Sequence, residues 1–173
     1  MKGIIRMKVL VNNTWVSPKT FSGRPALDFI RMEMNLRGTK EGCREGDCGA
    51  CAVMLGEPLP LKSGGGTRQT AAPGGKDGGT SAADRERRIW VPRYRAVPSC
   101  LLALGDLAGK HLITIEGLSS VSGGLSPVMG AFLEENASQC GFFSPGFIIS
   151  LSAWLAESEK LDIQGALKAV DGN

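Results

Sequence analysis

The stretch Gly42-Cys43-Arg44-Glu45-Gly46-Asp47-Cys48-Gly49-Ala50-Cys51 decides how this chain is built. Its three cysteines have the spacing C-x4-C-x2-C, and a fourth cysteine stands at position 100. The chain holds five cysteines, an odd number that speaks against a disulfide framework and favours metal or catalytic use. This stretch therefore predicts a metal site that the neighbouring elements fold to hold.

The spacing is the plant-type ligand pattern of a 2Fe–2S cluster. Each of two tetrahedral irons needs two thiolates besides the bridging sulfides, so the loop has to wrap closely around a small core. Glycines between the cysteines allow left-handed turns and let backbone N–H groups approach the sulfurs, where they stabilise an added electron. The predicted ligands are Cys43, Cys48, Cys51 and Cys100. Zinc binding through Cys48 and Cys51 is the alternative, but the glycine-spaced pattern suits a two-iron core better than a zinc knuckle.

Length and composition describe a globular chain without a membrane segment. Its 173 residues suffice for one moderate domain or two small ones, and 42% hydrophobic residues are enough for a packed core. The apolar run 4–11 is too short to span a bilayer and is interrupted by Arg6 and Lys8. Because no signal-peptide pattern is present, we expect a cytoplasmic protein that does not associate with membranes.

Positive charge is concentrated in one part of the chain. The net charge is +3, but residues 62–95 contain eight basic and three acidic residues, and the remainder has a net charge of −2. Residues 62–88 contain seven glycines and almost no large apolar side chain, which predicts a flexible, tolerated surface insertion. The alternative is contact of the basic run 85–88 with an acidic partner or nucleic acid. The lack of interleaved aromatic residues argues against nucleic acid.

The residues before the cysteine stretch predict a hairpin and a helix. Alternating residues at 7–11, a turn at Asn12-Asn13 and extended residues at 14–16 are typical of a β-hairpin. Apolar residues at helical spacing predict a helix from about 25 to 36, which Gly38 ends before the cysteine loop.

The residues after the cysteine stretch predict two further strands and a short helix. The run 52–55 is expected to form a buried strand, 101–104 a helix, and 111–116 a closing strand that Gly117 ends. His111 is the only histidine and invites a ligand or general-base interpretation. We interpret it as a strand-edge residue, since no second catalytic group has a sequence relation to it.

The last third of the chain has a different composition. Serine and glycine at 121–126 predict a boundary between a domain at 1–121 and a second domain at 122–173. Three N-cap signals then predict three short antiparallel helices. These signals are Ser126-Pro127, Ser144-Pro145 and Asp162.

The stretch 38–51, Cys100-Leu101-Leu102 and Gln139-Cys140-Gly141-Phe142 together resemble the iron–sulfur subunit of the molybdenum hydroxylases, the xanthine dehydrogenase family. The resemblance covers nearly the whole chain apart from the glycine-rich insertion. It implies an α+β fold with an N-terminal β-grasp, ferredoxin-like domain that holds one cluster. A C-terminal helical domain would hold a second cluster nearer the molybdenum cofactor.

The resemblance also implies a function. Electrons taken from substrate at molybdenum in a large subunit would pass through both clusters to FAD in another subunit or domain. The chain would then be an electron-transfer subunit of a hetero-oligomeric oxidoreductase, without an active site of its own. The substrate of the complex stays open between purines, aldehydes and heteroaromatic acids.

The second cluster site departs from the family pattern. Family members have Cys-Gly-Phe-Cys followed by Thr-Pro-Gly, whereas this chain has Cys140-Gly141-Phe142-Phe143 followed by Ser144-Pro145-Gly146. The family's last two ligands lie in a Cys-Arg-Cys run after Gly-Asn-Leu, and this sequence stops at Gly172-Asn173. Because Phe143 offers no lone pair to iron, we expect no second cluster from this chain alone. Cys140 is then a vestigial ligand, either a small buried apolar residue or a free thiol.

Gln139 corresponds, by the same resemblance, to a glutamine that approaches the pterin of the molybdenum cofactor. Its retention beside Cys140 indicates either a preserved docking surface or simple descent, and both interpretations stay open. The alternative function is a non-conducting structural or assembly subunit that docks on a molybdenum subunit.

Overall fold

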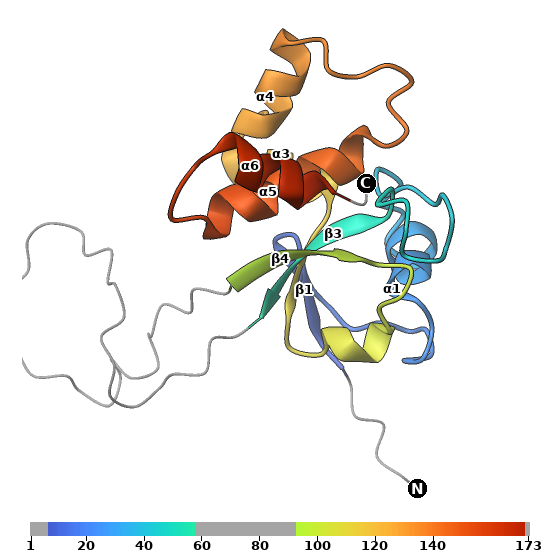
Figure 1. The fold of residues 1–173 in the computed structure, drawn as a ribbon. Coiled ribbons are helices and arrows are strands. Elements are labelled where there is room, and N and C mark those ends of the chain that lie inside the picture. Colours follow the sequence, from blue (N-terminus) through green and yellow to red (C-terminus); the bar gives the residue numbers. More distant parts are fainter. Residues whose placement is uncertain (1–6, 58–92, 172–173) are drawn as a thin grey trace, which may run out of the picture.

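A computed structural model describes residues 7–57 and 93–171, and the insertion predicted at 62–88 lies outside the described residues. Five strands form one mixed sheet in the order β2-β1-β5-β3-β4, with helices packed against it (Figure 1). The class is therefore α+β, as predicted. The strands are β1 (Val9–Val11), β2 (Thr14–Val16), β3 (Ala52–Glu57), β4 (Arg93–Pro98) and β5 (His111–Ile113).

The predicted hairpin at the start of the sheet is confirmed. β1 and β2 pair antiparallel with Val11 opposite Thr14. Asn12 in the turn has a φ of 53°, a left-handed conformation that asparagine tolerates better than most residues. β1 also pairs in parallel with β5, and β3 pairs antiparallel with both β5 and β4.

The helix predicted from about 25 to 36 is shorter and irregular. A single α-helical turn, α1 (Ala26–Asp28), continues as the π-helix η1 (Phe29–Glu33). The wider turns are visible in the bond from Met34 N–H to the Phe29 carbonyl, at 3.0 Å. Asn35, with a φ of 54°, then turns the chain away, so the helix ends before Gly38.

Two other local predictions are wrong. Residues 101–104 do not form a helix, because their backbone bonds to the α1 segment: Ala26 N–H donates to the Leu102 carbonyl at 2.7 Å. A short 3-10 helix, η2 (Leu104–Leu107), follows instead. The strand predicted at 111–116 is present but shorter, since it ends at Ile113. The helix α3 (Ile115–Ser122) follows it and includes Gly117, which was expected to end the strand.

Three further helices complete the chain: α4 (Pro127–Glu134), α5 (Ser144–Glu157) and α6 (Ile163–Val170). Two predicted N-caps are confirmed, since Ser126 Oγ accepts from Met129 N–H at 3.3 Å and Asp162 Oδ1 accepts from Gly165 N–H at 2.7 Å. Ser144 is the first residue of α5 rather than its cap. The prediction of three helices also missed α3.

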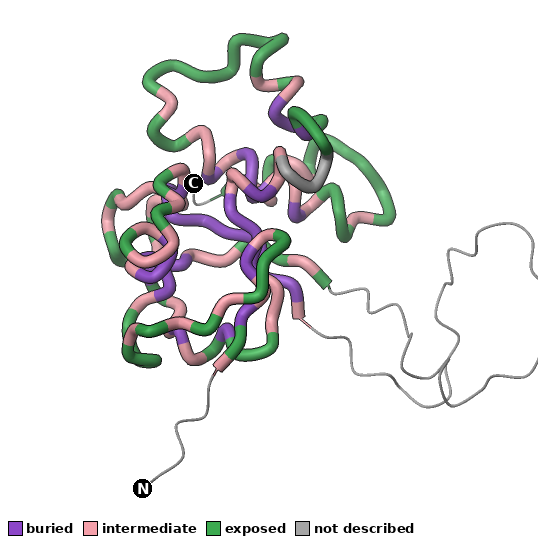
Figure 2. The backbone as a smooth tube through the Cα atoms, turned by 180° about the vertical axis from the view of Figure 1, so that it is seen from behind, coloured by how far each residue is buried: buried purple, intermediate pink, exposed green. Residues whose placement is uncertain are grey.

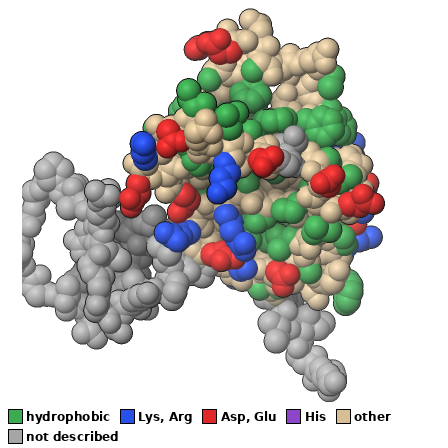
Figure 3. Space-filling model, viewed as in Figure 1, with side chains coloured by type: hydrophobic (Ala, Val, Ile, Leu, Met, Phe, Trp, Pro, Cys, Tyr) green, Lys and Arg blue, Asp and Glu red, His purple; other side chains and the backbone are tan. Residues whose placement is uncertain are grey.

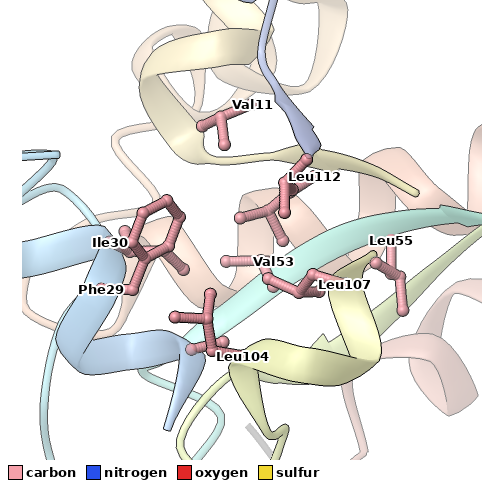
Figure 4. Packing of buried hydrophobic residues seen from close by; sticks show 10 residues of the cluster. Val11, Phe29, Ile30, Val53, Leu55, Leu104, Leu107 and Leu112 are labelled. Atoms are coloured by element: carbon pink, nitrogen blue, oxygen red, sulfur yellow. The ribbon is translucent and has the colours of Figure 1, made fainter. Parts of the chain in front are cut away.

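The main core lies between the sheet and the α1 segment. Its side chains come from β1, β3, β5, α1, η1 and η2 and are fully or almost fully buried (Figure 4). They include Val11, Phe29, Val53, Leu104 and Leu112. Figure 2 shows the buried stretches running through the strands and the elements packed on them.

A second core joins the helices to the sheet. Ile149 and Ala153 of α5 pack against Ala52 and Met54 of β3 and against Ile113 of β5. The predicted domain boundary near residue 121 falls within α3, and the division into two domains stays a prediction. In 7–57 and 93–171, no helix combines the length and the apolar character needed to cross a membrane.

Candidate iron–sulfur site

The register of two strands brings Cys51 and Cys100 together. Cys51 directly precedes β3, Cys100 follows β4, and these antiparallel strands pair Ala52 with Pro98 at that end. Ser99 reinforces the junction, because its N–H and its Oγ–H both donate to the Cys51 carbonyl, at 3.2 and 2.7 Å. The fourth predicted ligand thus sits at an element boundary, as the sequence predicts.

The four cysteines approach one another in two pairs. The thiol of Cys48 is close enough to Cys43 to affect its pKa, and Cys51 packs against Cys100 and affects the pKa of its thiol. Cys51 and Cys100 are 3% and 9% exposed and pack against Leu27 of α1. Cys43 and Cys48 are half-buried at the rim of the same loop.

Backbone donors favour the thiolate of Cys43. The N–H of Glu45 lies 3.3 Å from the Cys43 sulfur. With further donation from Cys48 and Asp47, it lowers the pKa of Cys43 to about 6. Such donors stabilise negative charge on sulfur, which a metal-bound thiolate needs.

The opposite side of the site is apolar. Burial raises the pKa of Cys100 to about 11, and the nearby Cys51 and Cys43 thiols add to the effect. Binding a metal there has to release the proton of a buried thiol, so metal binding and folding are coupled at this position.

Two glycines of the loop stand where a side chain would collide with a neighbour, and at Gly42 that neighbour is a thiol. A Cβ at Gly42 would lie 2.7 Å from the Cys48 sulfur, which no side chain can accept. Gly46 has a φ of 80°, and a Cβ there would lie 2.3 Å from Leu101 Cδ1. The loop therefore depends on glycine at both positions, as the predicted wrapping around a small core requires.

The donor arrangement fits a two-iron cluster better than a single ion. Within the part of the chain that the structure describes, no three His, Cys, Asp or Glu side chains gather closely enough to hold one metal ion. The zinc alternative through Cys48 and Cys51 stays a prediction. Two neighbouring thiol pairs match a core in which each iron takes two thiolates.

Comparison with known proteins points to iron–sulfur proteins, although the family match lies after the four thiols and contains only Cys140. Residues 114–173 match a family described as "[2Fe-2S] binding domain". Xanthine dehydrogenase 1 of Arabidopsis thaliana is 35% identical over 144 residues, which are 83% of this chain and 8% of that protein. The chain is related to the iron–sulfur region of the molybdenum hydroxylases. It spans less than a tenth of that plant relative.

Solved structures show the same fold. The aldehyde oxidoreductase from Desulfovibrio gigas superposes with a TM-score of 0.69 at 23% identity, over 96% of this chain and 14% of that one. Quinoline 2-oxidoreductase from Pseudomonas putida 86 gives a TM-score of 0.61 at 21% identity, over 98% of this chain and 81% of the other. This likeness shows that the chain shares the fold of the matched parts of these two proteins.

The second site predicted from the molybdenum hydroxylase pattern is open to solvent. Gln139 and Cys140 lie exposed on the loop between α4 and α5. Interpretation of Cys140 as a buried apolar residue is therefore wrong, and it is a free thiol. Phe142 and Phe143 are 40% and 41% exposed and stack edge to face, with ring centroids 5.3 Å apart. The position of Gln139 relative to a pterin stays a prediction.

His111 has a structural role at the start of β5. Its Nε2–H donates to the Asn12 carbonyl at 2.6 Å, and its Nδ1 therefore accepts from the Tyr94 hydroxyl at 2.6 Å. Burial lowers the pKa of His111, which keeps the ring neutral. Its structural interpretation is confirmed, although β5 lies inside the sheet rather than at its edge.

The sequence did not reveal the charged residues that fasten the cysteine loop. Arg44, within the loop, binds Asp28 of α1 at 2.8 Å. Because the two residues are 16 positions apart, no motif spacing connects them. The one available signal was the presence of an arginine between two predicted ligands, Cys43 and Cys48.

Proposed function

We propose that this chain is the electron-transfer iron–sulfur part of a molybdenum-hydroxylase-type oxidoreductase, with one 2Fe–2S cluster on Cys43, Cys48, Cys51 and Cys100. The pairing of the four thiols, Cys43 with Cys48 and Cys51 with Cys100, carries this proposal. A cluster held there would accept and release one electron at a time. The chain's own contribution is to supply the thiolates and to direct backbone N–H groups, such as that of Glu45, at a ligand sulfur.

We further propose that the molybdenum cofactor and FAD reside on partner subunits, and that this chain has no active site of its own. The comparisons support a region that can be a small part of one long chain or most of a separate chain. It is 8% of the plant xanthine dehydrogenase but corresponds to 81% of the matched chain of quinoline 2-oxidoreductase. Acidic and basic side chains are interspersed on the face in Figure 3, which suits a protein partner better than nucleic acid.

Metal analysis of the full chain tests the proposal. Anaerobically purified protein is expected to contain about two irons and two acid-labile sulfides per chain and to show a plant-type 2Fe–2S spectrum. Zinc in place of iron, or metal near zero after reconstitution with iron and sulfide, would contradict it.

A second candidate function is docking on a molybdenum subunit without conduction. Phe143, exposed where the family has a ligand, favours it, because a missing second centre would lengthen the path that an electron has to cross. Mixing the chain with its molybdenum partner and adding substrate separates the two functions. Conduction predicts bleaching of the cluster within turnover, whereas docking alone predicts a stable complex whose spectrum does not change.

A further inference from the structure

Five charged side chains of alternating sign connect the α1 segment to the cysteine loop. Arg44 is the central member and binds two carboxylates, with Nε 2.5 Å from Glu41 and NH2 2.8 Å from Asp28. Arg24 lies 3.9 Å from Asp28, and Arg31 lies 3.8 Å from Glu41. The Asp28 side chain is only 18% exposed, so this pair is better shielded from solvent than an ordinary surface ion pair.

Arg44 itself has an unusual backbone. Its φ is 62°, in the left-handed region that residues with a Cβ adopt only rarely. Such a conformation persists where the surrounding structure holds it. The two carboxylates bound to the guanidinium are the contacts that hold it here.

The conformation of Arg44 directs the next peptide group. Arg44 stands between Cys43 and Glu45, and the Glu45 N–H points back at the Cys43 sulfur at 3.3 Å. A right-handed Arg44 would rotate that peptide plane and remove the donor from the sulfur. The ion pairs with Asp28 and Glu41 thus act on Cys43 through the backbone.

We propose that Arg44 is a positioning residue of the cluster site: the clamp formed by Asp28 and Glu41 holds its left-handed backbone and so fixes the Glu45 N–H on the Cys43 sulfur. This inference rests on the proposed function, in which Cys43 is a cluster ligand. An N–H group that donates to a ligand sulfur stabilises the reduced, more negative state. The clamp therefore raises the midpoint potential of the cluster and slows its loss.

Three substitutions separate the backbone contribution from the charge. Arg44→Gly removes the charge but keeps a residue that adopts a positive φ without cost. Arg44→Ala removes the charge and leaves a left-handed residue without its clamp. Asp28→Asn keeps Arg44 and the size of the side chain at position 28, but it removes one carboxylate and so weakens the clamp. Arg95→Ala is the matched control, because Arg95 pairs with Glu57 at the same 2.8 Å on the far end of β3 and β4.

Redox titration followed by absorbance, and the rate of cluster loss to a chelator, are the measurements. Arg44→Ala is expected to lower the midpoint potential and to lose its cluster about fivefold faster, which corresponds to one hydrogen bond of about 1 kcal/mol. Arg44→Gly should keep the wild-type potential and rate of cluster loss, because glycine adopts the positive φ without the clamp. Asp28→Asn should change both quantities in the direction of Arg44→Ala, and Arg95→Ala should change neither.

The outcomes distinguish the two levels of the proposal. Wild-type protein without a 2Fe–2S spectrum would overturn the proposed function and this inference together. If the wild type has a cluster, and its potential and lifetime are unchanged in Arg44→Ala and Asp28→Asn as they are in the control Arg95→Ala, the positioning role alone is overturned.

Discussion

Two regions of this chain contain cysteines, and they differ in what surrounds the sulfur: the first is the loop 42–51 together with Cys100, and the second is the loop around Cys140. In the first, Cys51 and Cys100 are buried and the neighbouring strands hold them side by side. In the second, Cys140 is exposed and is followed by the exposed pair Phe142 and Phe143. Both loops contain a left-handed glycine, Gly46 and Gly141. The two regions therefore differ in the thiols near the cysteine rather than in the glycine turn, and we expect a cluster at the first region alone.

The same two regions also differ in what holds them in place. The first loop depends on glycines and ion pairs that leave room for the thiols. The helices around the second loop are held by apolar contacts, with Ile149 and Ala153 on the sheet and Ile148 against Val128 and Met129. Packing of this kind keeps the helices in place whether or not Cys140 binds a metal.

The largest expected effect comes from removing one thiol in each of the two cysteine regions. Cys100→Ser should abolish the 2Fe–2S spectrum and most of the bound iron, because it breaks one of the two thiol pairs. Cys140→Ser, the matched change in the second loop, should leave iron content and spectrum unchanged. Iron analysis with absorbance spectra measures both, and equal iron loss in the two variants would remove the distinction between the loops.

The contact between the helices and the sheet gives the next largest effect. Ile149→Ala removes a fully buried side chain from the core shared with β3 and should destabilise the protein by about 2–5 kcal/mol. Leu167→Ala on α6, where the side chain is 57% exposed, should change stability by less than about 0.5 kcal/mol. Denaturant unfolding measures both. A small effect of Ile149→Ala would mean that the two regions unfold independently.

Glycine substitutions should have opposite signs in the two regions. Gly46→Ala introduces a Cβ at a φ of 80° that would lie 2.3 Å from Leu101, and should destabilise the protein by about 1–3 kcal/mol. At Gly130 in α4 a Cβ would meet no atom within 4 Å, so Gly130→Ala should stabilise by up to about 1 kcal/mol. Thermal unfolding of the two variants provides the comparison, and destabilisation by both would contradict it.

The smallest effect is a pH dependence from His111 in the sheet. Its pKa is lowered by burial in the folded state and has its ordinary value of about 6.5 when unfolded. The unfolded chain therefore binds a proton first, and stability that is present above pH 6.5 is lost as the pH falls through the folded pKa. The free energy of unfolding changes by at most about 1.4 kcal/mol per pH unit through this one proton.

Melting temperatures between pH 7.5 and 5.5 measure this slope while the carboxylates stay ionised. His111→Gln keeps polar atoms at the position but does not titrate, so its melting temperature should depend less on pH than that of the wild type. Identical profiles would show that His111 contributes nothing to the pH dependence.

Local sequence information was sufficient where neighbouring residues decide the outcome. The hairpin at β1 and β2 and the caps Ser126 and Asp162 follow from residues a few positions apart. The helix expected at 25–36 is shorter and partly a π-helix, and no helix spans 101–104, because Leu102 accepts instead from Ala26 N–H of the α1 segment.

The sequence by itself determined which residues are the candidate ligands and that Phe143 follows Cys140-Gly141-Phe142, since spacing and residue type are local properties. Only the tertiary structure decided how the thiols pair, that Arg44 adopts a left-handed backbone, and that Asp28 holds it. The physical reason is that these contacts join residues far apart in the chain, and their geometry depends on the register of β3 with β4 and on the packing of α1 beneath the loop.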